Sequence, residues 1–246
     1  MNIFLIDDEL VLKPGVSATI AGEQHVHLVG VLKSSVGDVV KVGFVNKGVW
    51  SAHVKHIDLG LGQTHIELKE QVTCLSKPIH SIAIALPRPK AIKRIVEHIS
   101  TLGVRQITFF NAWRVEKSYW QSTKAEVDNL LAYADDGLRQ GGHPWRPKIR
   151  LVRFFNDFLK EPNELKMVLT PSVKEPLLTE LDLKDFQPRE FILGPEGGFI
   201  EKELDGFRRL DVPLFALNLP ILKTETAAAA VLAMANMYKY METHQK

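Results

Sequence analysis

The stretch LGPEGGFIEKEL, residues 193–204, joins an apolar run to three glycines within five residues and then to a helix-like segment. A strand, a glycine-rich turn and a helix in this order are typical of an α/β fold and of loops that bind phosphate groups. Here Pro195 removes one backbone N–H, and Glu196, Glu201 and Glu203 place negative charge in the loop and the first helical turn. The loop matches neither common phosphate-binding pattern. It therefore predicts a ligand without phosphates, or a tight turn that binds nothing.

Outward from this loop, strands and helices alternate from about residue 79 onward. IHSIAIAL (79–86) has the uninterrupted apolar character of a buried strand, and KAIKRIVEHISTLG (90–103) has one apolar helical stripe ending at Gly103. The same reasoning predicts further strands at 104–110, 149–155, 166–170, 189–194 and 213–217, and further helices at 122–137, 199–210 and 224–240. This order predicts an α/β domain with a mostly parallel sheet and a ligand at the carboxyl ends of its strands.

The first seventy residues differ, because they contain short β-rich runs separated by turns, beginning with HVHLVGVL (25–32). Such runs predict a small β-barrel or sandwich, with a boundary that divides the chain into domains 1–72 and 73–246. Five of the nine histidines lie at positions 25, 27, 53, 56 and 65, so a metal site has to be considered. No cysteine or H-E-x-x-H pattern accompanies them, which favours ordinary strand and surface histidines over a metal site.

Composition limits the classes of protein that the chain can belong to. Cys74 is the single cysteine, the N-terminus carries acids where a signal peptide needs basic residues, and no apolar run is long enough to cross a bilayer. We therefore expect a soluble cytoplasmic protein. Residues 88–153 hold 13 Lys/Arg against 6 Asp/Glu, a net charge of +7. That excess indicates either a solvated face or a nucleic-acid partner.

The final predicted helix, with AAAAVLAMANMY at 227–238, is apolar on nearly every side. A helix of this kind is normally buried all round. At the end of a chain, two arrangements provide that cover: a subunit interface, or a central position within a monomer.

Two segments resemble a known family when they are taken together. GPEGGF (194–199) and ILKTETA (221–227) are similar to the signature of the RsmE family, the 16S ribosomal RNA uridine N3-methyltransferases of the SPOUT superfamily. LGVRQITFFNAWR (102–114) and HLVGVLKSSVGD (27–38) extend the resemblance over nearly the whole chain. The resemblance implies a PUA-like β-barrel followed by a domain with a deep trefoil knot, a homodimer, and S-adenosylmethionine as methyl donor. It implies no metal and no membrane partner.

The resemblance also implies roles for individual residues. Arg114 is the first candidate to stabilise charge on the uracil oxygens, Lys223 is the second, and Glu225 or a water would accept the N3 proton. RNA phosphates would be bound by Lys33, Arg139, Arg146 and Lys148. The cofactor would be bound by Leu169, Leu193, Gly194, Glu196, Gly197, Gly198, Leu217, Leu222, Thr224 and Thr226.

Alternatives remain open beside these roles. Each residue also has a purely structural alternative: Arg114 only pairs with a carboxylate, Thr224 only caps the final helix, and Glu225 only complements the dipole of that helix. The chain departs from the family pattern at Thr101, Arg139, His143 and Pro220. A SPOUT enzyme acting on another nucleotide, and a non-catalytic RNA-binding dimer, are the alternative functions.

Overall fold

The computed structural model describes residues 2–161, 165–171, 175–179, 187, 189–217 and 220–244, with side chains of the last helix described as far as residue 239. The chain divides into two compact units. One unit consists of Met1–Lys77 and Leu138–Arg146, and the other of Pro78–Gly137 and Pro147–Lys246. The first unit thus continues past residue 72 and takes in a second segment that the sequence-based boundary assigned to the other domain.

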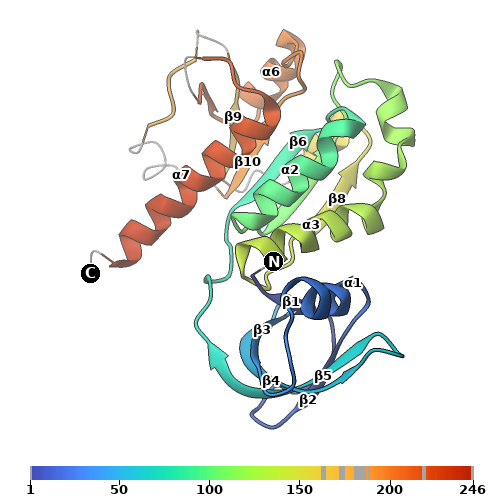
Figure 1. Cartoon of the computed structure of the whole chain (residues 1–246). Helices are drawn as coiled ribbons and strands as arrows, with labels where there is room; N and C mark the ends of the chain where they lie inside the picture. The colour runs from blue at the N-terminus through green and yellow to red at the C-terminus, as the bar shows by residue number, and fades with distance from the viewer. Residues whose placement is uncertain are drawn as a thin grey trace. The chain divides into compact units, whose positions relative to one another are not determined.

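The first unit is built on one curled sheet with the strand order β1-β3-β4-β5-β2, which forms an open half-barrel (Figure 1). Neighbouring strands are antiparallel except for β1 and β3, which run parallel. Inward-facing apolar side chains such as Val42, Phe44 and Ile66 alternate with exposed ones and form its core. The strands are β1 Phe4–Ile6, β2 Ser17–Ala21, β3 Val39–Phe44, β4 Gly48–Asp58 and β5 Gln63–Val72.

The prediction of a strand at residues 25–32 is wrong. This segment forms α1 (Gly22–Val26) followed by one π-helical turn, η1 (His27–Val31). His25 and Leu28, three residues apart, are buried, whereas the intervening Val26 is exposed. The two buried residues therefore have helical spacing, although the β-branched composition of the segment favours a strand.

The second unit contains a six-stranded sheet, and all its strand pairs are parallel. The strand order is β11-β9-β10-β6-β7-β8. The first strand in the chain, β6, is central, β7 and β8 follow on one side of it, and β9, β10 and β11 lie on the other side. The direction of winding reverses between β6 and β10, and ligands of open α/β sheets bind at such a switch point. The strands are β6 Ser81–Ala85, β7 Gln106–Phe110, β8 Lys148–Val152, β9 Lys166–Leu169, β10 Glu190–Leu193 and β11 Leu214–Phe215.

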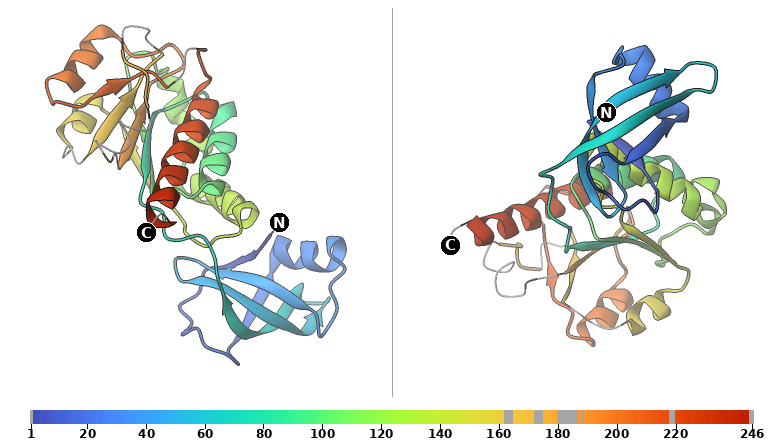
Figure 2. Two further views of the ribbon diagram at one scale, coloured as in Figure 1. Left: turned by 90° about the vertical axis from the view of Figure 1, so that its left-hand side faces the viewer. Right: turned by 90° about the horizontal axis from the view of Figure 1, so that it is seen from below.

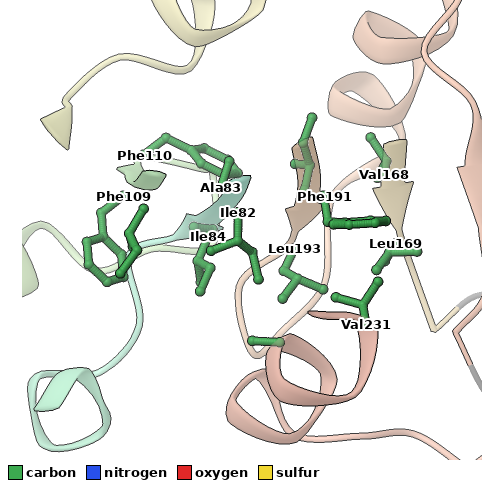
Figure 3. Close-up of a cluster of buried hydrophobic side chains, with 14 of the residues drawn as sticks. Ile82, Ala83, Ile84, Phe109, Phe110, Val168, Leu169, Phe191, Leu193 and Val231 are labelled. Atoms are coloured by element: carbon green, nitrogen blue, oxygen red, sulfur yellow. The ribbon is translucent and has the colours of Figure 1, made fainter. Parts of the chain in front are cut away.

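Helices cover both faces of this sheet, with α2 and α7 side by side on one face and α4 and α6 on the other (Figure 2). Phe155 of α4 meets Phe207 of α6 edge to face, with ring centroids 5.5 Å apart. On the opposite face, Val231 of α7 lies next to Leu169 and Leu193 (Figure 3). The helices are α2 Pro89–Thr101, α3 Val127–Gly141, α4 Phe155–Lys160, α6 Glu201–Arg208 and α7 Thr224–His244.

The parallel strands and α2 confirm the predicted α/β class. The stripe of α2 is buried as expected, and Gly103, with φ +81°, follows its end. The helix predicted at 122–137 instead begins at Val127, because residues 117–125 form two short 3₁₀ turns, η2 and η3. Within the single chain, the described part of the final helix is buried along one face, and Met237 is 62% exposed, so the chain alone does not provide the cover that its apolar sequence calls for.

Candidate functional site

A cavity of about 500 Å³ lies at the carboxyl ends of β6, β9 and β10, next to the start of α7. Its position is the switch point of the sheet, where the glycine loop of residues 194–198 leaves β10. Residues from 87–95 and from 220–227 both contribute to its walls. The cavity is lined by Pro87, Arg88, Lys90, Ala91, Arg94, Ile95, Leu169, Thr170, Pro171, Leu193, Gly194, Pro195, Glu196, Gly198, Phe199, Leu217, Pro220, Ile221, Leu222, Lys223, Thr224, Glu225 and Ala227.

The glycine loop needs its glycines for packing and for backbone geometry. A Cβ atom on Gly194 would lie 3.0 Å from the ring of Phe199, and one on Gly197 would lie 3.0 Å from Cδ of Arg114. Gly198 has φ +73°, a left-handed conformation that other residues rarely adopt. The Gly198 N–H donates to the Pro195 carbonyl at 2.7 Å and closes the turn. At Gly194 and Gly198 the loop therefore presents backbone rather than side chains to the cavity.

Charge in the cavity is organised by two contacts of α2. The Glu196 carboxylate accepts a hydrogen bond from the Arg88 N–H at 3.2 Å, so the acidic residue of the loop is joined to the start of α2. Arg94 of α2 donates to Glu225 of α7 across the cavity, with Nη2 and Oε2 3.2 Å apart. A phosphate in the loop would face the Glu196 carboxylate, and this repulsion agrees with the sequence-based argument against nucleotides.

Most of the predicted cofactor residues come together in this cavity. Eight of the ten line it: Leu169, Leu193, Gly194, Glu196, Gly198, Leu217, Leu222 and Thr224. Gly197 and Thr226 do not line it: Gly197 packs against Arg114, and Thr226 is exposed on the first turn of α7.

Two of the three predicted catalytic residues line the cavity, and the third contacts the glycine loop. Lys223 and Glu225 belong to the lining. Arg114 lies outside the lining, but its Nη1 donates to the Gly197 carbonyl on the other side of the loop. The structure thus brings Arg114 to the glycine loop through a backbone contact that the sequence did not indicate.

The four predicted RNA-binding residues are divided between the units. Lys33, Arg139 and Arg146 belong to the first unit, and Lys148 lies exposed on β8 of the second. Lys33 is also exposed, whereas the Arg146 side chain is 19% exposed and forms an ion pair with Asp7. The Arg139 carbonyl accepts the Asn2 N–H at 2.9 Å, so part of this residue supports the N-terminus.

Sequence reasoning missed the cationic wall formed by Arg88, Lys90 and Arg94, which line the cavity from the first turns of α2. The segment PRPK at 87–90 follows a buried strand directly, and that signal points to the carboxyl edge of the sheet.

Sequence reasoning treated Glu203 only as a negative charge and also missed its structural role; the residue is 5% exposed. Its carboxylate accepts the Ile200 N–H at 2.9 Å and the Trp113 N–H at 2.8 Å. Glu203 therefore caps α6 and holds the loop that carries Arg114. Its position three residues after the helix N-cap is typical of a capping glutamate, but its second partner is 90 residues away.

Comparison with known proteins agrees with this architecture. A family model described as an RNA methyltransferase domain matches residues 75–236. The chain belongs to this RNA methyltransferase family. The match covers every segment that lines the cavity.

Two relatives match this RNA methyltransferase over nearly the whole of both chains. It is 28% identical over 235 residues to ribosomal RNA small subunit methyltransferase E 1 of Borreliella burgdorferi, covering 94% of this chain and 95% of the relative. It is 28% identical over 252 residues to ribosomal RNA small subunit methyltransferase E of Treponema pallidum, covering 97% and 93%.

A solved structure of ribosomal RNA small subunit methyltransferase E from Neisseria gonorrhoeae, bound to S-adenosyl methionine, has the same fold. It matches with a TM-score of 0.77 at 17% identity, covering 99% of this chain and 97% of that one. A putative methyltransferase from Legionella pneumophila, in complex with the bound cofactor SAM, matches with a TM-score of 0.75 at 20% identity, covering 96% and 98%.

Among the described residues, none of the helices combines the length and the apolar character that a membrane span requires. Within the same ranges, no group of three or more His, Cys, Asp or Glu side chains is placed to hold a metal ion.

Proposed function

We propose that the protein transfers a methyl group from S-adenosylmethionine to N3 of a uridine in 16S ribosomal RNA of the small subunit. The observation that carries this proposal is the meeting of the GPEGGF loop and the ILKTETA segment in one cavity at the switch point of the sheet. The relatives that match over nearly the whole chain are ribosomal RNA small subunit methyltransferases, which supports the substrate class.

The residues of the cavity fit such a cofactor. A volume of about 500 Å³ is in the range of small-molecule sites. Leu169, Leu193 and Leu217 would hold the adenine between apolar walls. The backbone around Gly194 would form hydrogen bonds with the polar edge of the adenine. The lining carries the carboxylates of Glu196 and Glu225 and the cations of Arg88, Lys90, Arg94 and Lys223, so it has groups that complement both the sulfonium and the carboxylate of S-adenosylmethionine. Leu222 and Thr224 would bind from the opposite segment.

The reaction requires N3 of uridine to lose a proton while negative charge spreads onto O2 and O4. S-adenosylmethionine, when bound, supplies the electrophilic methyl group. A guanidinium carries five N–H donors, and since one of them binds the Gly197 carbonyl, Arg114 keeps others for a uracil oxygen. Lys223 provides a second positive charge from the lining of the cavity. Glu225, or a water beside it, would accept the N3 proton.

The remaining parts of the proposal concern assembly and RNA binding. The chain would form a homodimer through the exposed side of α7, where Thr226, Ala233 and Met237 are spaced along one stripe. The first unit would act as a PUA-like RNA-binding domain, with phosphate contacts from Lys33, Arg139, Arg146 and Lys148. The proposal includes the family's trefoil knot and a location in the cytoplasm, where the ribosome is found.

Substitution of Arg114 tests the chemical role. We expect Arg114→Ala to lower turnover roughly 10²- to 10³-fold, because removal of one charge-stabilising donor has an effect of this size. Arg209→Ala, which removes an exposed arginine at the end of α6, is the matched control. Full turnover of Arg114→Ala with normal cofactor affinity would show that the assignment is wrong.

Two measurements test the function itself. Calorimetry with S-adenosylmethionine distinguishes an enzyme from a non-catalytic binding module, since absence of binding would exclude every methyltransferase function considered for the protein. Mass analysis of 16S ribosomal RNA from a deletion strain tests the target. We expect one N3-methyluridine to disappear there, and its presence at normal levels would refute the substrate, leaving another RNA nucleotide as the target.

A further inference from the structure

An exposed tryptophan lies next to the candidate catalytic arginine. The side chain of Trp113 is 78% exposed, although tryptophan is among the most buried residue types on average. It lies on the segment that follows β7, at the carboxyl edge of the sheet. Phe154, which follows the adjacent strand β8, is 68% exposed. Both rings are therefore presented at the same edge of the sheet as the glycine loop.

The backbone beneath Trp113 is fixed. Its N–H donates to Oε1 of the buried Glu203 at 2.8 Å, and its neighbour Ala112 is 3% exposed. Val115 is buried as well, so the exposed ring projects from a turn that is anchored on both sides. A ring held in this way loses little conformational entropy when a flat ligand stacks on it.

Cationic residues accompany the aromatic ones in the segments that follow β7 and β8. Arg114 follows Trp113 directly, Lys117 is exposed one turn later, and the Arg153 guanidinium lies 5.2 Å from the ring centroid of Trp120. The acidic residue of this segment, Glu116, accepts a hydrogen bond from the Tyr119 hydroxyl at 2.9 Å. Aromatic rings interleaved with arginines and lysines are typical of surfaces that bind single-stranded nucleic acid.

Trp113 is connected to the proposed methyl-transfer site through Arg114, the next residue in the chain. Arg114 touches the glycine loop, with its Cδ 3.0 Å from the position of a Cβ on Gly197. Trp113 precedes Arg114 directly, so it lies one residue from the group that would face the uracil oxygens.

We infer that Trp113 is a stacking platform for an unpaired nucleotide adjacent to the target uridine, with Phe154 and Arg153 extending the platform along the strand ends. The inference rests on the proposed function and narrows its substrate to RNA whose target region is single-stranded. Bases of any sequence can stack on such a ring, so the platform selects unpaired structure rather than sequence.

Equilibrium binding to two RNA probes tests this inference. Fluorescence anisotropy with the full-length protein would compare a short single-stranded uridine-rich RNA with a duplex of the same length. We expect Trp113→Ala to weaken binding of the single strand by about 5- to 150-fold and binding of the duplex far less. Trp113→Phe should restore most of the affinity, whereas Trp113→Leu, which keeps apolar volume without a π-face, should not.

Matched controls separate this inference from the proposed function. Val127→Ala removes an exposed apolar side chain at the start of α3 and should leave RNA binding unchanged. Wild-type protein that binds S-adenosylmethionine and methylates RNA, while Trp113→Ala binds the single strand normally, would overturn the platform and leave the proposed function intact. Wild-type protein that binds no S-adenosylmethionine would instead overturn the proposed function. A Trp113→Leu protein that loses its dimer in sedimentation would assign the ring to a subunit contact and also overturn the platform.

Discussion

Replacing Glu203 with alanine should release the loop that carries Arg114 from helix α6. The Glu203 carboxylate is the acceptor for two backbone donors, the N–H groups of Ile200 and Trp113. Both donors lie in partly buried positions, and the carboxylate itself is 5% exposed. The substitution would leave both donors without their acceptor and would remove the cap of the helix.

The magnitude follows from these two contacts. An unsatisfied buried N–H costs about 1–3 kcal/mol, and partial access of water reduces that penalty. We therefore expect Glu203→Ala to lower the free energy of unfolding by about 2–4 kcal/mol. Glu203→Gln keeps one carbonyl acceptor and should lose about half as much. Arg114 would also lose its fixed position, so turnover should fall more than cofactor affinity does.

Urea unfolding and a methyl-transfer assay measure the two effects. The matched control is Glu201→Ala, which removes a glutamate from the same helical turn whose side chain is 74% exposed and pairs with Arg208. An exposed pair of this kind contributes about 0–1 kcal/mol. Equal urea midpoints for Glu203→Ala and Glu201→Ala, together with normal turnover, would refute the reasoning.

Two further predictions concern the sheet and its helices. Gly137→Ala should lower the free energy of unfolding by about 1–3 kcal/mol in urea titrations, because the added Cβ would lie 2.3 Å from the Glu97 carbonyl oxygen; an unchanged midpoint would contradict the close approach of α2 and α3. Burial raises the pKa of Glu190 more than Lys166, 3.7 Å away, lowers it. The folded state then holds this proton more tightly, so stability falls as pH rises from about 4.3 through the folded pKa. Glu190→Gln should match or exceed wild type at about pH 7 and lose that advantage at about pH 4, and a destabilised variant at neutral pH would show that the ion pair outweighs desolvation.

The second unit could be predicted well because its signals are local. The strand β6 is an uninterrupted apolar run, and α2 repeats its apolar residues at helical spacing, so each element is evident within a dozen residues. The segment at 25–32 failed because β-branched composition and helical burial period disagree there, and the contacts of the first unit decide between them. Strands β1 and β2 were not predicted, because β1 has only three residues and β2, with the sequence SATIA, carries a single large apolar side chain, Ile20.

The site could be predicted only where one segment carries the signal. The glycine loop and the start of α7 were found from their own residues, but their pairing came from family resemblance. Arg94 meets Glu225, 131 residues away, and Glu203 meets Trp113, 90 residues away. Partners at such separations depend on strand order, and no local pattern in the sequence specifies that order.

The strand order of the second unit also determines when the cavity can form during synthesis. Its walls come from segments 87–95, 169–171 and 193–199, from Leu217 and from segment 220–227, and the last of these follows every strand of the sheet. A growing chain therefore has no complete cavity until almost its entire length has left the ribosome. A ligand of this cavity would stabilise finished chains and leave truncated ones unprotected, so heat resistance gained on ligand addition would measure the fraction of intact protein in a preparation.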